Sequence, residues 1–389
     1  MDKVCGLDVH KDSVFACILD ENGKKILEER YGTLTPDLDK LRDALVHHGA
    51  GRVAMESTSI YRVLRTQYKY WIPVWRVLES DFEMTLVNPY LIKQLPGRKS
   101  DIKDAQWIAQ CLQKEMLRGS YVPCEDLQQM RQYSRRYSYL SKNIVRVEQR
   151  IDNHYQRCNI RISNYVSNQG QNVSIRKVTK AVIGGERDSE KLCRLVHGRI
   201  KNKHGKEVIT ASLTGMITGV DVEMLRQCIE ELELLEKQQS KCMNLLEELA
   251  QKYYAREISL LCTIPGIKKL SAMCILAELG GDLTAFFSAA LLVGWAGLRP
   301  RNEESAGKIR SRKTLHGNKY LRKMLVQVAW SAALSNKSFL GKKYQQLSKR
   351  MKPQKALLAI ARKLLVIIFN VLSKKQPFDP VKNMQTVKV

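Results

Sequence analysis

The chain has 389 residues, 44% of them hydrophobic and 27% charged, which are ordinary values for a globular protein of two or three domains. Its net charge of +26 is not ordinary and indicates a polyanionic partner, nucleic acid rather than a membrane. Ten cysteines without a CxxC pair argue against a disulfide scaffold or a zinc ribbon, and neither HExxH nor a Walker A loop is present.

The positive charge is concentrated in the C-terminal part. Residues 1–118 hold 18 lysines and arginines against 17 acids, whereas residues 299–375 hold 20 against two. A region of this kind binds phosphates, and such binding weakens with salt because counterions are released. We therefore expect a nearly neutral N-terminal domain joined to a nucleic-acid-binding C-terminal one.

The first hundred residues show the pattern of an α/β domain. The expected elements are strands at 3–9, 13–20 and 25–32, a helix at 37–49, a strand at 52–57, a helical segment, a strand at 83–88 and a helix at 100–117. Asn-Gly in "ENGKK" predicts a hairpin between the second and third strands, and Ser100 is the expected N-cap of the last helix. This order predicts a mixed sheet covered by helices.

Residues 126–162 form a predicted basic helix with four interleaved tyrosines. A solvated charged face would show the same pattern, but we favour a nucleic-acid contact with tyrosines available for stacking. The basic residues are Arg131, Arg135, Arg136, Lys142, Arg146, Arg150, Arg157 and Arg161.

A helix after residue 220 repeats its core positions in three-four spacing over about four heptads. The positions are Leu225, Cys228, Leu232, Leu235, Gln239, Cys242, Leu246, Leu249 and Tyr253. The helix either packs on its own domain or pairs with a second chain. We favour an intermolecular coiled coil, in which Gln239 would fix the register.

The remaining sequence predicts a basic, mostly helical domain. Residues 260–281 carry two short helical pieces around Pro265-Gly266, which fits a helix-hairpin-helix that offers backbone amides to a DNA phosphate, or a plain αα-hairpin. Residues 357–372 are apolar but interrupted by Arg362 and Lys363, which favours a buried helix over a membrane span. The charged N-terminus is not that of a signal peptide.

Four acids are candidate metal ligands. Asp101 and Asp104 stand one helical turn apart in "GRKSDIKDA", while Asp8 and Glu56 lie on predicted core strands. Helix capping by Asp101 and pairing of Asp104 with Lys103 or Arg98 would also explain the first pair. An acid on a core strand is costly to bury unpaired, so we favour a Mg²⁺ site formed by all four acids.

Seven motifs in register resemble the DEDD insertion-sequence transposases related to the Piv invertase, the bridge-RNA-guided recombinases. They span about residues 4–335 and read "GLDVHK", "AMESTSIY", "LVNPYLIKQLPGRKSDIKDAQWIA", "LRGSYVP", "IPGI", "WAGLRP" and "GNKYLRKML". The chain departs from the pattern by an apparent insertion at 62–70, which should remove no ligand.

The resemblance implies three parts: a RuvC-like (ribonuclease-H-type) domain at 1–120, a basic helical region with a coiled coil at 121–256 and a transposase domain at 257–389. It implies that Asp8, Glu56, Asp101 and Asp104 bind Mg²⁺. It also implies a nucleophilic serine after the Gly-Leu-x-Pro motif, which falls on Ser305. The family places this serine directly before glycine, but Ala306 intervenes here. Ser311 is therefore the nearest competitor, and Ser271 a weaker one.

The implied activity is RNA-guided recombination of donor and target DNA through a phosphoserine, by a dimer or tetramer in the bacterial cytoplasm, associated with the nucleoid and not with a membrane. A junction-resolving metal-dependent nuclease without the serine step is the alternative, and a non-catalytic DNA-binding protein is a third reading. The residues expected to contact nucleic acid are Arg98, Lys99, Arg131, Arg135, Arg136, Arg146, Arg150, Arg299, Arg301, Lys308, Arg310, Arg312, Lys313, Lys319 and Arg322.

Overall fold

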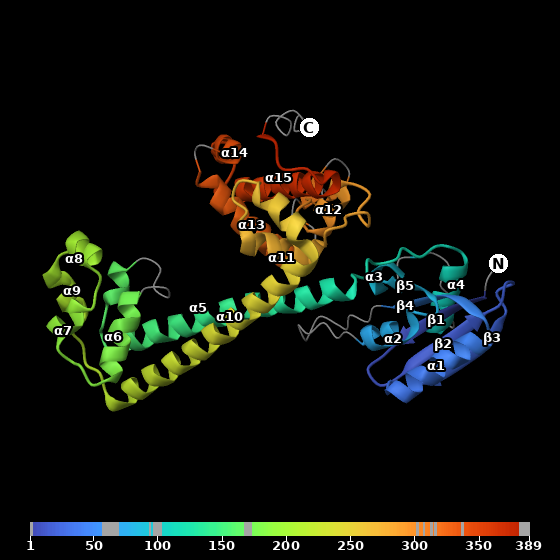
Figure 1. Cartoon of the computed structure of the whole chain (residues 1–389), viewed down its shortest axis with the longest axis horizontal. Helices are drawn as coiled ribbons and strands as arrows, with labels where there is room; N and C mark the ends of the chain where they lie inside the picture. The colour runs from blue at the N-terminus through green and yellow to red at the C-terminus, as the bar shows by residue number, and fades with distance from the viewer. Residues whose placement is uncertain are drawn as a thin grey trace. The chain divides into compact units, whose positions relative to one another are not determined.

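Figure 1 shows the computed structural model of the chain, which describes residues 3–56, 70–92, 95, 103–166, 173–300, 303–305, 308–311, 314, 317–335 and 338–380. The chain divides into two compact units, residues 1–122 and 123–389. Each unit is considered by itself below. The finer division with domain ends at 120 and 256 stays a prediction.

The first unit is built on the mixed sheet that the sequence predicts. Its five strands are β1 (Lys3–Val9), β2 (Val14–Leu19), β3 (Lys25–Tyr31), β4 (Ala50–Glu56) and β5 (Glu83–Val87), in the order β3-β2-β1-β4-β5. The first three strands form an antiparallel meander, and β4 and β5 add in parallel beside β1. The carboxyl ends of β1, β4 and β5 therefore lie at one edge.

Helices cover both faces of this sheet. The helices α1 (Thr35–His47) and α2 (Trp71–Leu78) pack on one face, where Leu41 and Val74 join the cluster of Leu7. The short α3 (Pro89–Ile92) and α4 (Asp104–Gln113) contribute to the cluster on the other face, around Val4. Because both faces are covered, β1 and β2 are apolar along almost their whole length.

The helix α4 is shorter than the sequence predicts. It begins at Asp104, because Lys103 before it has an extended backbone with φ −62° and ψ 146°. The described helix thus begins four residues later than expected, and the predictions that concern Ser100 and Asp101 fall outside the described residues. Residues 96–102 lie outside the described part of the chain.

The second unit is organised by two long helices, α5 (Glu125–Arg157) and α10 (Gly219–Cys262), which pack side by side (Figure 1). At one end they share a core with α6 (Val173–Ile183), α7 (Ser189–Arg194), α9 (Lys206–Ser212) and η1 (Ile162–Tyr165), near which lies α8 (Gly198–His204). At the other end they join α11 (Lys269–Leu279), α12 (Ala289–Trp295), α13 (Lys319–Ala333), α14 (Phe339–Ser348) and α15 (Pro353–Lys374). A two-stranded hairpin, β6 (Glu303–Ser305) and β7 (Lys308–Ser311), stands between α12 and α13 in the sequence.

Several heptad positions of α10 pack within the chain, and the expected intermolecular coiled coil stays a prediction. Leu225 and Leu232 are buried in the cluster at one end of α5, and Leu246 in the cluster at the other end. Between them, Gln239 donates a hydrogen bond to Ser141 of α5 at 2.8 Å. These positions of the seam therefore contact α5 of the same chain, and Gln239 bonds within the chain.

The apolar helix α15 belongs to the core of the second unit. Among the described residues it is the one helix long and apolar enough to cross a membrane, and half of its apolar window is buried. Leu364, Leu365 and Ile368 pack in the same cluster as α11 and α13. This packing agrees with the buried helix that Arg362 and Lys363 suggested in the sequence.

Gly6 sets how closely α4 approaches the sheet. A Cβ atom at this position would lie 2.2 Å from the carbonyl oxygen of Ala105 and 2.4 Å from the amide nitrogen of Ala109. We predict that Gly6→Ala lowers the free energy of unfolding by about 1–3 kcal/mol, because backbone atoms must move to admit the methyl group. Urea denaturation measures this change.

Gly119→Ala in the same unit is the control, since its Cβ atom would meet only Thr85 at 3.6 Å. Equal destabilisation by the two substitutions would contradict the close approach of α4.

Candidate active site

Asp8 and Glu56 lie next to each other in the register of the sheet. Leu7 of β1 pairs with Met55 of the parallel strand β4, so the following residues, Asp8 and Glu56, stand at adjacent positions. Side chains alternate along a strand, and Ala54, two residues before Glu56, belongs to the cluster that includes α4. Both carboxyl groups therefore share the α4 face at the carboxyl edge of the sheet.

Asp104 faces the same region from the first position of α4. It lines an open pocket of about 340 Å³ together with Asp8, Phe15, Glu28 and Lys103. Lys103 pairs with Glu28 of β3 at 2.9 Å, and Asp104 is a second acid in the pocket beside Asp8. The pocket thus joins residues of β1, β2, β3 and α4.

The surroundings of Asp8 favour its neutral form. Its side chain is only 14% exposed, and burial raises the pKa of its carboxyl group above the usual value. His10, whose Nε2 lies 3.0 Å from Oδ2 of Asp8, opposes this rise, and the negative charge of Asp104 adds to it. A cation bound between the two aspartates would reverse the raised pKa.

The residues present fit a hard divalent cation in kind, because carboxylate oxygens are its preferred ligands. In the described part of the chain no group of three or more His, Cys, Asp or Glu side chains gathers in a metal-binding arrangement. Asp101, Arg98 and Lys99 lie outside the described residues. The structure thus brings Asp8 and Asp104 to one pocket, with Glu56 at the strand position beside Asp8.

The predicted nucleophile Ser305 stands at the end of a short hairpin in the second unit. Ser305 is the last residue of β6 and pairs with Lys308, the first residue of β7. The competitor Ser311 ends β7, and Ser271 caps the turn before α11 by accepting a hydrogen bond from the amide of Lys268 at 2.9 Å. Side chains of the hairpin, including those of Lys308 and Arg310, lie outside the description, as do residues Arg301, Arg312 and Lys313.

The two ends of the loop that carries this hairpin are held together. Pro300 forms an isolated bridge with Thr314, and the amide of Asn318 donates to the carbonyl oxygen of Trp295 at 3.0 Å. Gly317 approaches Gly297 so closely that a Cβ atom would lie 2.2 Å from its amide nitrogen. The base of the loop is therefore fixed to the end of α12.

Family models match both units. One for DEDD transposases of the IS110 type, described as a transposase, matches residues 5–160, and one described as a transposase of the IS116/IS110/IS902 family matches residues 258–345. The chain belongs to this IS110 family of transposases. The resemblance seen in its seven motifs is thereby confirmed.

Two curated relatives match part of this IS110-family chain. The pilin gene-inverting proteins of Moraxella bovis and Moraxella lacunata are each 35% identical over 124 residues, which is 31% of the chain and 38% of either relative. The match thus spans well under half the length of these relatives. Among solved structures, Thermus thermophilus RuvC in complex with a Holliday junction substrate aligns over 31% of this chain and all of its own, with 14% identity and a TM-score of 0.25, too low to carry an argument.

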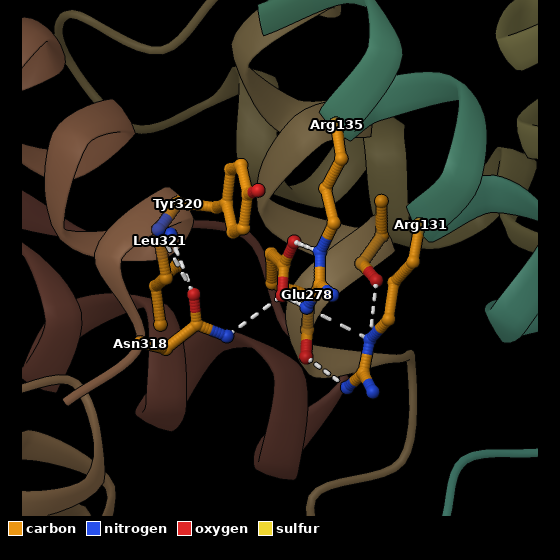
Figure 2. A network of polar contacts seen from close by, with 7 residues as sticks. Arg131, Arg135, Glu278, Asn318, Tyr320 and Leu321 are labelled. Carbon is orange, nitrogen blue, oxygen red and sulfur yellow. Dashed lines mark hydrogen bonds and ion pairs between the residues drawn. The ribbon is translucent and has the colours of Figure 1, made fainter. Parts of the chain in front are cut away.

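The buried carboxylate of Glu278 joins α5, α11 and α13 (Figure 2). It lies near the base of the loop between α12 and α13 that carries Ser305, called the serine loop below. Glu278 at the end of α11 is 1% exposed and accepts two hydrogen bonds from Arg135 of α5, both at 2.9 Å. Asn318 donates to the same carboxylate at 2.7 Å and caps α13 through the amides of Tyr320 and Leu321. Glu278 thereby ties α5 to the residue that closes the serine loop.

Arg131 and Arg135 were expected to contact nucleic-acid phosphates. In the structure both donate hydrogen bonds within this protein network. Arg131 donates to the carbonyl oxygens of Ala277 and Glu278 at 3.0 and 2.6 Å, and the Arg135 guanidinium also stacks on Tyr320 at 4.7 Å (Figure 2). Their donors are directed at the C-terminal end of α11, a favourable place for positive charge.

The other described members of the predicted nucleic-acid set are more exposed. Arg136 donates to Gln238, Arg150 pairs with Glu231 at 2.5 Å, and Arg146 is exposed on the same helix α5. In the C-terminal part, Arg299 and Lys319 are exposed. Arg322 donates to Gly297 and Thr314 and thus supports the loop base. A phosphate contact by these residues stays a prediction.

Two residues that support these sites, His10 and Glu278, were not predicted from the sequence, although a local pattern marks each of them. His10 follows Asp8 by two residues, the spacing that puts side chains on one face of a strand. Glu278 is the single acid in the apolar run "SAMCILAELGG", where burial requires a partner.

We predict that Glu278→Ala lowers the free energy of unfolding by about 3 kcal/mol, because it strips a partly buried arginine of its partner. Because Arg135 is 26% exposed, we expect a loss of unfolding free energy at the lower end of the range for breaking a buried ion pair. Chemical denaturation of the purified protein measures it.

Glu247→Ala is the matched control, since Glu247 and its partner Lys269 are 40% and 52% exposed. It should cost less than about 1 kcal/mol. An equal loss of unfolding free energy in the two variants would show that the Glu278 network stabilises the fold no more than an exposed ion pair does.

Proposed function

We propose that this chain is a recombinase of an insertion sequence, which cuts donor and target DNA and rejoins them. The observation that carries the proposal is the placement of Asp8 beside Glu56 at one strand edge, with Asp104 facing Asp8, in a chain of a transposase family. Acids gathered at this cost of desolvation and repulsion serve a purpose other than stability. The sheet order with three antiparallel and two parallel strands supports the RuvC-like fold expected for this unit.

Within this proposal Asp8, Glu56, Asp101 and Asp104 hold Mg²⁺. The ion would supply positive charge that polarises the scissile phosphate. Asp8 and Glu56 are placed by the sheet and Asp104 by α4, so these three ligands rest on regular elements. The raised pKa of Asp8 supports the assignment, because it reflects a carboxylate held where its charge is poorly compensated by the protein.

Ser305 is proposed as the nucleophile. Its Oγ would attack the phosphorus of the scissile phosphodiester, forming a Ser–O–P bond while the DNA–O–P bond breaks. The serine proton leaves to solvent or a base, and the departing DNA oxygen takes up a proton. A hydroxyl of the other DNA then attacks the phosphoserine and releases the serine, so no bond energy is lost to water. Cationic residues beside the hairpin would stabilise the charge of each transition state: Arg299, Arg301, Lys308, Arg310 and Arg312.

The proposed partners are donor and target DNA, a structured bridge RNA that selects them, and further copies of this chain in a dimer or tetramer. The net charge of +26 supports nucleic-acid partners, and the choice of RNA as guide rests on the family resemblance. Assembly through the coiled coil of α10 is part of the proposal, and Tyr253 at one of its heptad positions is 38% exposed. The expected place of action is the bacterial nucleoid.

A covalent protein–DNA adduct tests the serine step. We predict that the protein with its native RNA, Mg²⁺ and a labelled DNA bordering its gene gives an adduct that survives denaturation. Ser305→Ala and Asp8→Asn should each reduce it at least about a hundredfold, because one removes the nucleophile and the other a metal ligand. Gel mobility of the denatured label measures the adduct.

Ser311→Ala is the control and should keep the adduct. Loss with Ser311→Ala and retention with Ser305→Ala would transfer the role to Ser311. DNA cleavage that persists in Ser305→Ala without any adduct would instead establish the metal-dependent nuclease that hydrolyses with water.

The guide is tested on the same preparation. We predict that a discrete RNA copurifies with the chain, that ribonuclease treatment abolishes strand exchange, and that adding back the purified RNA restores it. Sequencing of the RNA and a recombination assay with and without it provide the measurement. Full recombination by RNA-free protein would refute the guide while leaving the serine chemistry intact.

A further inference from the structure

A polar groove of about 570 Å³ lies within the second unit, apart from the serine hairpin and the carboxylates. Its walls are formed by α5 and α10 with Arg176 of α6, by the turn that precedes α11, and by α13. Two of the family motifs contribute to its lining, through Gly266 of "IPGI" and Lys323 of "GNKYLRKML", but neither motif assigns a ligand to it. The groove is large enough for a ligand the size of one or two nucleotides.

The groove carries unpaired positive charge at one end. Lys268 of the turn and Lys323 of α13 both line it, and Lys142 of α5 stands close enough to Lys323 to repel it. None of these lysines forms an ion pair with any residue that the structure describes. Burial, and then the charge of Lys142, lowers the pKa of Lys323, as expected where cations lack a counterion.

The two acids of the groove, Glu148 and Glu236, lie at its other end and share one cation, Arg176. Arg176 binds Glu236 through two hydrogen bonds of 2.5 and 2.9 Å and lies 3.7 Å from Glu148. The surplus of charge in the groove therefore belongs to the lysine end. A ligand that binds there has to bring negative charge.

The lysines project from rigid elements. The turn before α11 packs against α13 at Gly266, whose φ is +91° and whose Cβ atom would lie 3.0 Å from the side chain of Ala332 and 3.1 Å from the carbonyl oxygen of Val328. The lining combines apolar side chains with polar ones, among which Gln239 donates to Ser141 at 2.8 Å. Such a surface suits a hydrated polyanion better than an apolar peptide.

We propose that this groove binds the phosphodiester backbone of a nucleic-acid strand, with Lys142, Lys268 and Lys323 contacting its phosphates. The strand is single where it enters, since the groove is too small for a duplex. The site goes beyond the proposed recombination chemistry, because neither Ser305 nor a carboxylate of the first unit takes part. DNA and guide RNA share the chemistry that these lysines recognise, and the experiment separates them.

The test is the salt dependence of binding, measured in the Ser305→Ala background so that the outcome is independent of covalent chemistry. Fluorescent single-stranded DNA, single-stranded RNA and duplex DNA are titrated at several salt concentrations. Replacement of the three lysines by glutamine should weaken binding of at least one single strand at least tenfold. It should also lower the slope of log affinity against log salt by about 2, because each phosphate contact of a single strand contributes about 0.7.

The control removes the same charge from exposed lysines that do not line the groove: Lys177, Lys203 and Lys206. Its slope should change by less than half as much. A change confined to DNA or to RNA identifies the strand, whereas equal changes in the two triple variants, or none, overturn the site. Should the triple variant fail to fold, judged by its circular-dichroism melting curve, Lys323→Gln alone has to lower the slope by about 0.7 against Lys203→Gln.

Discussion

The constraint on which the first unit depends is the crowding of carboxylates at one edge of a sheet covered on both faces. Asp8 and Glu56 are neighbours by strand register, and Asp104 is brought against Asp8 by α4. Such an arrangement opposes folding, since burial and repulsion both disfavour the charged form of Asp8. The apolar clusters on both faces of the sheet and the close packing of α4 against Gly6 stabilise the fold and hold these carboxylates in place.

In the second unit the constraint is the attachment of the loop between α12 and α13 that carries Ser305. The serine hairpin is short, but its base is joined to α12 by Asn318 and Gly317. Asn318 is in turn held by Glu278, which Arg135 links to α5. A charged hydrogen-bond network is more directional than apolar packing, so it specifies the orientation of the loop base relative to the long helices.

Much of the first unit could be predicted from sequence, because strand periodicity and hairpin chemistry are local. The start of α4 could not, since nothing in the local sequence marks Lys103, an extended residue without a side-chain cap, as the residue before the helix. The partner of the α10 heptads could not either. A three-four pattern states that Leu232 and Leu246 need an apolar partner, but a second copy and α5 of the same chain satisfy it equally.

The basic residues show why counting charge locates nucleic-acid contacts poorly. Arg131 and Arg135 are part of a conspicuous basic helix, yet the fold supplies them with a buried acid and the carbonyls of a helix end. Lys323 was not among the residues expected to contact nucleic acid, yet the fold places it near Lys142 without an ion-pair partner among the described residues. A guanidinium fork is well suited to an internal carboxylate, whereas an ammonium group is compact and strongly hydrated. The cations available to a phosphate are therefore those that the fold has left uncompensated, and they emerge only once every buried acid has been assigned its partner.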